Sequence, residues 1–191
     1  MEELDLKSYN KYINFVDEFY NIIKNKIYDN IIFVCIGTDR ITGDCFGPIV
    51  GSILLNKKIK YKIPNIQILG CLEENVNFSK IEEKVIPQIL KYEKPLVISI
   101  DAALSEQCNI GKIYIKNEGM ELGKSLNKHM ELFGDISIKA VVGKNMKSNK
   151  ENFTILQNIS LNEVIRLSNL VANGIIEVMN KKNKCGKNVY I

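Results

Sequence analysis

The stretch IIFVCIGTDRITGDCFGP, residues 31–48, decides the fold. Its first six residues are apolar and mostly β-branched, which is typical of a strand buried on both faces. A polar loop follows over residues 37–44. The segment 46–55 then predicts a helix, because Pro48 stands near its first turn, where the missing N–H of proline costs nothing. A buried strand, a loop and a helix in this order form the first unit of an alternating α/β chain.

The rest of the chain repeats this alternation. Apolar runs predict strands over 66–71, 95–100, 111–116 and 136–142. Helical spacing of apolar residues covers 6–27, 78–92 and 161–179, with a break expected at Pro87 and a capping box at Ser160 and Glu163. We therefore expect a three-layer α/β/α sandwich around a mostly parallel sheet, with one or two antiparallel strands near 111–116.

Length and composition fit one domain over residues 1–191, with an N-terminal helix inside 1–30 and a frayed tail over 181–191. The formal charge is +4 and nearly all basic residues are Lys, so a base-reading nucleic-acid surface is not expected. The acidic, polar N-terminus and the lack of a long apolar run argue against a signal peptide and a membrane partner. Five Cys without a CxxC pair favour reduced thiols in the cytoplasm.

Two Asp residues follow buried strands and are the candidate catalytic groups. Asp44 ends the loop after the strand at 31–36, and Asp101 follows the strand at 95–100. Because ligands bind beyond the carboxyl ends of strands in open α/β sheets, both side chains are expected at one edge. Two adjoining carboxylates share a proton and activate water, or they hold a divalent metal. The alternative for each residue is an N-cap of the next helix.

Neighbouring residues are candidates for substrate binding or for shaping the loop. Asp39 and Arg40 share the loop with Asp44, and Arg40 is suited to hold a carboxylate. Gly43 and Gly47 flank Asp44, where their backbone N–H groups would bind an oxyanion or where they are turn residues only. Glu73 follows the strand at 66–71 and would rim the same edge. The single His of the chain, His129, is expected on the surface.

These motifs resemble the YyaC-type spore proteases of endospore-forming bacteria. Residues 36–51 are similar to the family pattern IGTDRxTGDxxGPxVG, and residues 70–76 to GTLxEPVHAxN. Residues 100–102, 133–138 and 156–158 resemble IDAxLG, VGDxSI and the start of LQNTRLxxVxxMA. The family is in turn similar to the spore germination protease and to hydrogenase-maturation endopeptidases. The resemblance implies an α/β/α fold of the phosphorylase/hydrolase type.

The same resemblance implies a function. The germination protease has two essential Asp residues, in PDALGP and IDAL motifs, which fall on Asp44 and Asp101 here. In the hydrogenase-maturation enzymes the matching acids and a His bind a metal, but residues 142–156 contain no His. We therefore expect a cytoplasmic, sporulation-associated peptidase, including in the forespore, that acts on a protein or peptide without a cofactor. Two alternatives stay open, an inactive peptide- or partner-binding relative and a metal-dependent hydrolase, and so does the oligomeric state.

Overall fold

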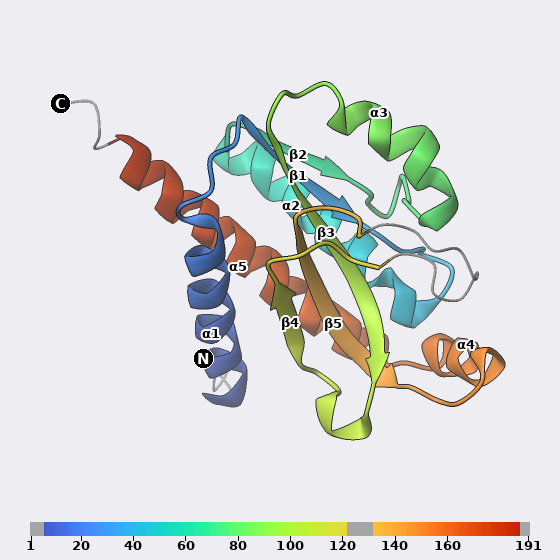
Figure 1. Ribbon diagram of the computed structural model, residues 1–191. Coiled ribbons are helices and arrows are strands. Elements are labelled where there is room, and N and C mark those ends of the chain that lie inside the picture. The colour runs from blue at the N-terminus through green and yellow to red at the C-terminus, as the bar shows by residue number, and fades with distance from the viewer. Residues whose placement is uncertain (1–5, 122–131, 188–191) are drawn as a thin grey trace.

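The computed structural model describes residues 6–121 and 132–187. A sheet in the order β2-β1-β3-β5-β4 forms its centre (Figure 1). Its strands are β1 (Asn30–Cys35), β2 (Ile66–Leu69), β3 (Pro95–Ser105), β4 (Ile113–Lys116) and β5 (Ile136–Lys144). The first four strands of this order, β2, β1, β3 and β5, run parallel to one another. The edge strand β4 pairs antiparallel with β5. The expected mostly parallel sheet, with its antiparallel strand near 111–116, is confirmed.

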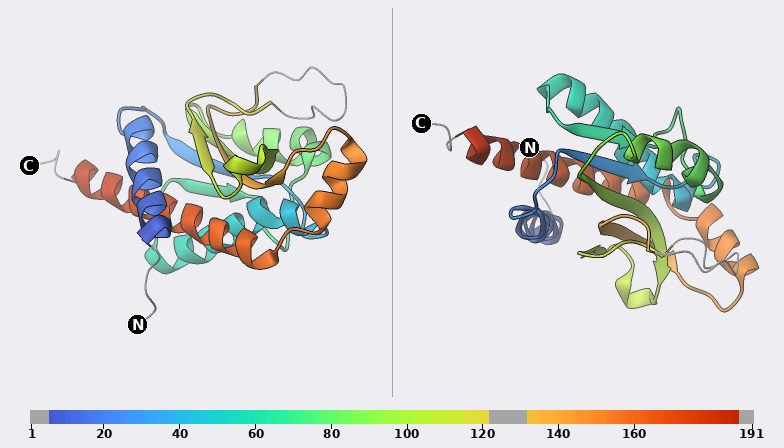
Figure 2. Two further views of the ribbon diagram at one scale, coloured as in Figure 1. Left: turned by 90° about the horizontal axis from the view of Figure 1, so that it is seen from below. Right: turned by 45° about the horizontal axis from the view of Figure 1, so that its top comes forward.

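Helices cover both faces of the sheet, which gives the expected three layers (Figure 2). One face carries α1 (Leu6–Ile23), α2 (Phe46–Tyr61) and α5 (Leu161–Lys187), and the other carries η2 (Phe78–Lys80), η3 (Ile81–Val85) and α3 (Ile86–Ile89). Alternation along β1 divides the core, because Phe33 packs on the first side and Val34 on the second. Both side chains are fully buried, as the continuous apolar run predicts.

Several boundaries differ from those that the sequence predicts. α1 ends at Ile23, and Ile27 is 90% exposed beyond it. α2 extends to Tyr61, where Lys62 closes it in the left-handed conformation at φ 48°. The segment 78–92 is three short helical pieces, with Pro87 in the first turn of α3, where its missing N–H is tolerated. The break expected at Pro87 therefore lies just before it.

Residues 181–187, expected to belong to a frayed tail, are part of α5, which continues to Lys187. Lys181 forms an ion pair with Glu177 one turn earlier, at 2.9 Å. The Nζ of Lys182 donates to the carbonyl of Ile23 at 2.9 Å and lies 4.1 Å from the centre of the Tyr28 ring. These contacts tie the end of α5 to the end of α1. Of the helices in the described ranges, none is both long and apolar enough to cross a membrane.

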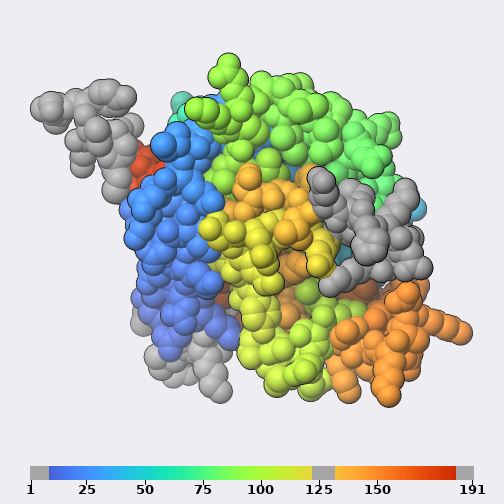
Figure 3. All heavy atoms as spheres, in the orientation of Figure 1, coloured from blue at the N-terminus to red at the C-terminus, as the bar shows by residue number. Residues whose placement is uncertain are grey.

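The helix α4 (Asn149–Gln157) is not expected from the sequence, because its residues are mostly polar and none is buried. It stands at the edge of the molecule, orange in Figure 3. Its N-cap is Ser148, whose Oγ accepts from the Glu151 N–H at 3.2 Å and donates to the Glu151 carboxylate at 2.8 Å. The Ser148–Glu151 spacing is that of a capping box, although the Glu151 carboxylate here accepts from the Ser148 hydroxyl and not from its backbone N–H.

We expect Ser148→Ala to lower the free energy of unfolding by about 1 kcal/mol, the usual cost of losing an N-cap. The substitution removes the hydroxyl group, so the Glu151 N–H loses its acceptor. Urea unfolding followed by circular dichroism measures this loss. Ser148→Asp, which keeps an acceptor at the cap, is the control, and an equal loss in both variants contradicts the capping role.

Candidate active site at the carboxyl edge of the sheet

Asp44 lies in a short 3-10 turn, η1 (Thr42–Cys45), that leads from the loop after β1 into α2. The loop turns back on itself at Gly37, which has φ +142°. A Cβ at Gly37 would lie 2.1 Å from the Asp44 carbonyl oxygen, so a side chain at this position is excluded. The Thr38 N–H donates to the same carbonyl at 3.3 Å. Gly37 therefore permits the close turn that brings half-buried Asp44 to the end of the sheet.

Asp101 lies within β3 and does not follow it, so the predicted strand end is wrong. β3 continues to Ser105 because β5 pairs with it as far as Lys144. The Oδ1 of Asp101 accepts from the N–H of Ala102 at 2.8 Å. Ile100 and Ala102 face the layer of α1, α2 and α5, so the alternation of the strand directs Asp101 to the opposite face. The carboxyl group is half-buried there.

The structure brings Asp44 and Asp101 together, close enough for the charge of Asp44 to raise the pKa of Asp101. Burial and then the charge of Asp44 raise the pKa of Asp101 to about 8, against the opposing effects of the Ala102 N–H and the Lys139 ammonium. The pKa of Asp44 is also raised, because burial outweighs the opposing effect of a hydrogen bond from the Thr38 backbone. Asp101 therefore keeps its proton at neutral pH, and Asp44, whose charge raises the pKa of Asp101, is the group of the pair that ionises first.

A protonated and an ionised carboxyl group side by side are equipped for general acid–base chemistry. The carboxylate of Asp44 is able to accept a proton from water, and the carboxyl group of Asp101 is able to donate one. The pKa of about 8 keeps Asp101 charged in only a minor fraction of molecules at pH 7. When the environments of two carboxyl groups differ, their pKa values differ, and the group with the higher pKa is the one suited to act as the acid.

Lys139 is a residue of this site that the sequence reasoning missed. It is the register partner of Asp101 across the β3–β5 pair, and Tyr114 of β4 is its partner on the other side. Its ammonium group favours the charged form of Asp101. The sequence carries a sign of this role, because Lys139 is a charged residue in the middle of the mostly apolar run of residues 136–142. A charge within a buried strand needs a partner nearby.

The other predicted site residues are distributed along the neighbouring loops. Asp39 is exposed and accepts from the Asn75 side-chain amide at 2.6 Å, which links the loop after β1 to the loop after β2. The side chain of Arg40 is exposed, and its backbone N–H donates to the Thr38 hydroxyl at 3.3 Å. Glu73 is exposed, with its carboxylate 3.7 Å from the Cys71 sulfur. These contacts support a role in shaping the loops.

Gly43 and Gly47 occupy positions of close packing. A Cβ at Gly43 would lie 2.8 Å from the Leu156 side chain, and one at Gly47 would lie 2.0 Å from the carbonyl oxygen of Ile36. Gly47 thereby lets the first turn of α2 touch the end of β1. Both residues are buried, and packing accounts for the absence of side chains.

Neither an activated thiol nor a cluster of metal ligands is found among the described residues at this edge. Burial and then the charges of Asp39 and Asp44 raise the pKa of Cys45, so its sulfur is a thiol and no activated nucleophile. Across residues 6–121 and 132–187, no three His, Cys, Asp or Glu side chains converge as metal ligands do. His129 lies outside the described residues. The chemistry of the described part of the site therefore rests on the carboxyl groups of Asp44 and Asp101.

The fold is similar to that of a hydrogenase maturation protease. The [NiFe] hydrogenase maturation protease HycI from Thermococcus kodakarensis KOD1 superposes with a TM-score of 0.51 at 18% identity, covering 83% of this chain and 99% of HycI. HybD from Thermococcus kodakarensis gives a TM-score of 0.47 at 12% identity over 78% of this chain and 99% of its own. Peptidyl-tRNA hydrolase from Acinetobacter baumannii gives 0.48 at 14% identity over 83% and 97% of the two chains.

Sequence comparison gives the family. The Bacillus subtilis (strain 168) protein described as "Uncharacterized protein YyaC" is 32% identical over 145 residues, which is 76% of this chain and 67% of the relative. Residues 3–174 match the family described as "Protein of unknown function (DUF1256)". That match spans the strands, the loop of Asp44 and the strand of Asp101. The chain therefore belongs to the DUF1256 family, which confirms the resemblance to YyaC-type proteins.

Proposed function

We propose that this protein is a sporulation-associated peptidase that hydrolyses a peptide bond with Asp44 and Asp101 as base and acid. The observation that carries the proposal is the meeting of the two carboxyl groups in unequal environments at the end of the sheet. The similarity in fold to a [NiFe] hydrogenase maturation protease is consistent with it. The substrate is a protein or peptide, since the resembled families act on proteins.

In the proposed reaction, the Asp44 carboxylate takes a proton from a water molecule as the water oxygen attacks the peptide carbonyl carbon. The carbonyl π bond opens, and its electron pair forms the oxyanion of a tetrahedral intermediate. Asp101 then gives its proton to the peptide nitrogen as the C–N bond breaks. The proton taken up by Asp44 passes to Asp101 and restores the starting state. Lys139, beside Asp101, favours the charge that Asp101 acquires when it donates.

We also propose the compartment. Cys35, Cys45, Cys71 and Cys108 are free thiols. Free thiols persist where glutathione and thioredoxin keep them reduced. We therefore assign the protein to the cytoplasm, including the forespore during sporulation.

The proposed function is tested with extracts of sporulating cells of an endospore-forming bacterium that lacks its own copy of this protein. Purified protein is added, and new peptide N-termini are identified by mass spectrometry. The matched control is the Asp44→Asn, Asp101→Asn double variant. New N-termini made only by the native protein support the proposal, and identical peptide sets contradict it.

The second candidate function, binding without hydrolysis, gives a different result in the same experiment. An inactive relative retains a peptide or partner from the extract and produces no new N-termini. Retention by the native protein and by the double variant alike, with no cleavage, supports a binding protein. Retention by the double variant only, with cleavage by the native protein, supports the peptidase.

The raised pKa of Asp101 also predicts how stability depends on pH. The carboxyl group titrates near 8 in the folded chain and near about 3.9 when unfolded, so between these values the folded chain keeps a proton that the unfolded chain loses. Its contribution to stability is therefore full below about pH 4 and is lost as the pH rises through about 8. From pH 5 to pH 8 the Tm of the native protein should fall by at least about 3 °C more than that of Asp101→Asn. Parallel Tm curves for the two proteins contradict the shifted pKa.

A further inference from the structure

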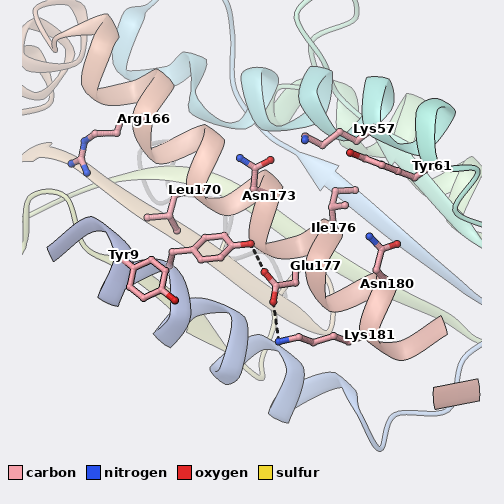
Figure 4. Close-up of a pocket in the computed structure, with 11 residues that line it drawn as sticks. Tyr9, Lys57, Tyr61, Arg166, Leu170, Asn173, Ile176, Glu177, Asn180 and Lys181 are labelled. Carbon is pink, nitrogen blue, oxygen red and sulfur yellow. Dashed lines mark hydrogen bonds and ion pairs between the residues drawn. The ribbon is translucent and has the colours of Figure 1, made fainter. Parts of the chain in front are cut away.

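A groove lies between three helices on the side of the molecule that carries α1, α2 and α5. Figure 4 shows α5 along its floor, with Tyr9 of α1 on one side and Lys57 and Tyr61 of α2 on the other. The groove has a volume of about 850 Å³, and Leu170 and Ile176 lie at its base. Tyr9 and Tyr61 are 50% and 49% exposed. Two aromatic side chains are therefore accessible in this groove, above a base of mostly buried aliphatic residues.

A second cavity of about 730 Å³ continues the groove, since Tyr61 and Asn180 line both. It reaches Ile31 and Ile66, which stand at the amino ends of β1 and β2. The Asp44 and Asp101 pair lies at the carboxyl end of the sheet. We call the two cavities together the α5 groove, and it is separate from the candidate active site.

The α5 groove is strongly basic. Five cationic side chains line it, Lys57, Lys62, Arg166, Lys181 and Lys182, against one carboxylate, Glu177. The Tyr12 hydroxyl donates to Glu177, which also pairs with Lys181 (Figure 4). These two contacts lower the pKa of Glu177, so it is charged and already paired. Arg166 pairs with Glu163 of the same helix at 2.8 Å. An occupant of the α5 groove therefore meets chiefly the positive charges of Lys57, Lys62 and Lys182.

We propose that the α5 groove is the docking site for an acidic, amphipathic segment of a partner protein. An acidic face would complement the Lys side chains along the rim, and an apolar face would cover Tyr61, Leu170 and Ile176. Asn173 and Asn180 add side-chain amides that are able to bond a peptide. A second copy of this chain is disfavoured, because a symmetric contact through the groove would bring its cations against the same cations. Nucleic acid is disfavoured by the scarcity of Arg.

The test uses a fluorescein-labelled peptide of fifteen residues that has Leu and Phe at helical spacing and Glu at all the remaining positions. Fluorescence anisotropy measures its Kd for the full chain. We expect the Kd to rise by at least about tenfold in Lys57→Glu, Lys62→Glu, and also in Tyr61→Ala. The matched control is Lys147→Glu, Lys150→Glu, which makes the same charge change at exposed positions around the start of α4 and should leave the Kd unchanged.

Three results would overturn the proposal. One is equal binding of a peptide with Lys in place of Glu. Another is an equal loss of affinity in the groove variant and in the control variant. The third is a preference for another occupant, seen as self-association in light scattering that the groove variant abolishes, or as tighter binding of a fifteen-base oligo-dT. Asp101→Asn should bind the peptide as the native protein does, so failure of the proposed peptidase activity leaves this test intact.

Discussion

An Asp101→Asn variant is expected to hydrolyse its substrate about a thousandfold more slowly than the native protein, the typical contribution of a positioned general acid. The amide has nearly the shape of the protonated carboxyl group and keeps an acceptor for the Ala102 N–H. It has no acidic proton to give to the departing nitrogen. The loss should appear in kcat and leave KM nearly unchanged, because the group acts in the transition state. Steady-state kinetics on a substrate identified from its new N-terminus measures both constants.

Asp29→Asn is the matched control for this variant. Asp29 makes the same kind of contact, accepting from the Glu93 and Lys94 backbone at 2.9 and 3.2 Å, but at the amino end of the sheet. Its kcat should stay within about twofold of the native value, as expected for a side chain remote from the reaction. The native rate should also fall above pH 8, where Asp101 loses its proton. A fully active Asp101→Asn variant rules out the proposed acid.

Gly47→Ala is expected to lower the free energy of unfolding by about 3 kcal/mol or more, the upper range for overpacking. The added methyl carbon would lie 2.0 Å from the Ile36 carbonyl oxygen. That oxygen belongs to the backbone, so no side chain is able to move aside. The first turn of α2 would have to lift away from the end of β1, and the loop that carries Asp44 would move with it. Urea unfolding of both proteins measures the difference.

Gly111→Ala is the control for the chemical change itself. Gly111 has φ +79°, and the atom nearest to an added Cβ is the Lys11 Nζ at 3.7 Å. Only the cost of a left-handed conformation applies there, about 1 kcal/mol. A loss at Gly47 no greater than that at Gly111 contradicts the close approach. Large losses of activity in Gly47→Ala with native stability would point instead to a role in binding the oxyanion.

The sequence predicts the sheet well and singles out Asp44 and Asp101 as the candidate catalytic pair, for identifiable reasons. The run from Ile31 to Ile36 is apolar at every position, so burial on both faces is its only favourable environment. Strands of this kind alternate with helices and leave few arrangements other than a parallel sheet. Asp101 comes directly after such a run, and Asp44 ends the loop that follows another. The meeting of the two groups follows from the shared edge.

Other features depend on partners that are distant in the sequence. The continuation of β3 past Asp101 is set by the length of β5 and is absent from the local pattern of residues 101–105. Lys139 becomes a neighbour of Asp101 only through register. α4 has a cap but no buried side chain, so hydrophobic periodicity gives no sign of it. Strand pairing or helix capping decides each of these features. The pattern of apolar residues along the sequence does not reveal either of them.

The two carboxyl groups differ in the scaffold that carries them. Asp101 lies within β3, where Lys139 of β5 is its register partner, whereas Asp44 stands on a turn whose shape depends on Gly37. Insertions or exchanges between residues 37 and 43 would therefore reposition one group while leaving the other in place. Replacing this turn with the turn of a relative would therefore move Asp44 relative to Asp101 and alter substrate selectivity, while the strand that carries Asp101 stays unchanged.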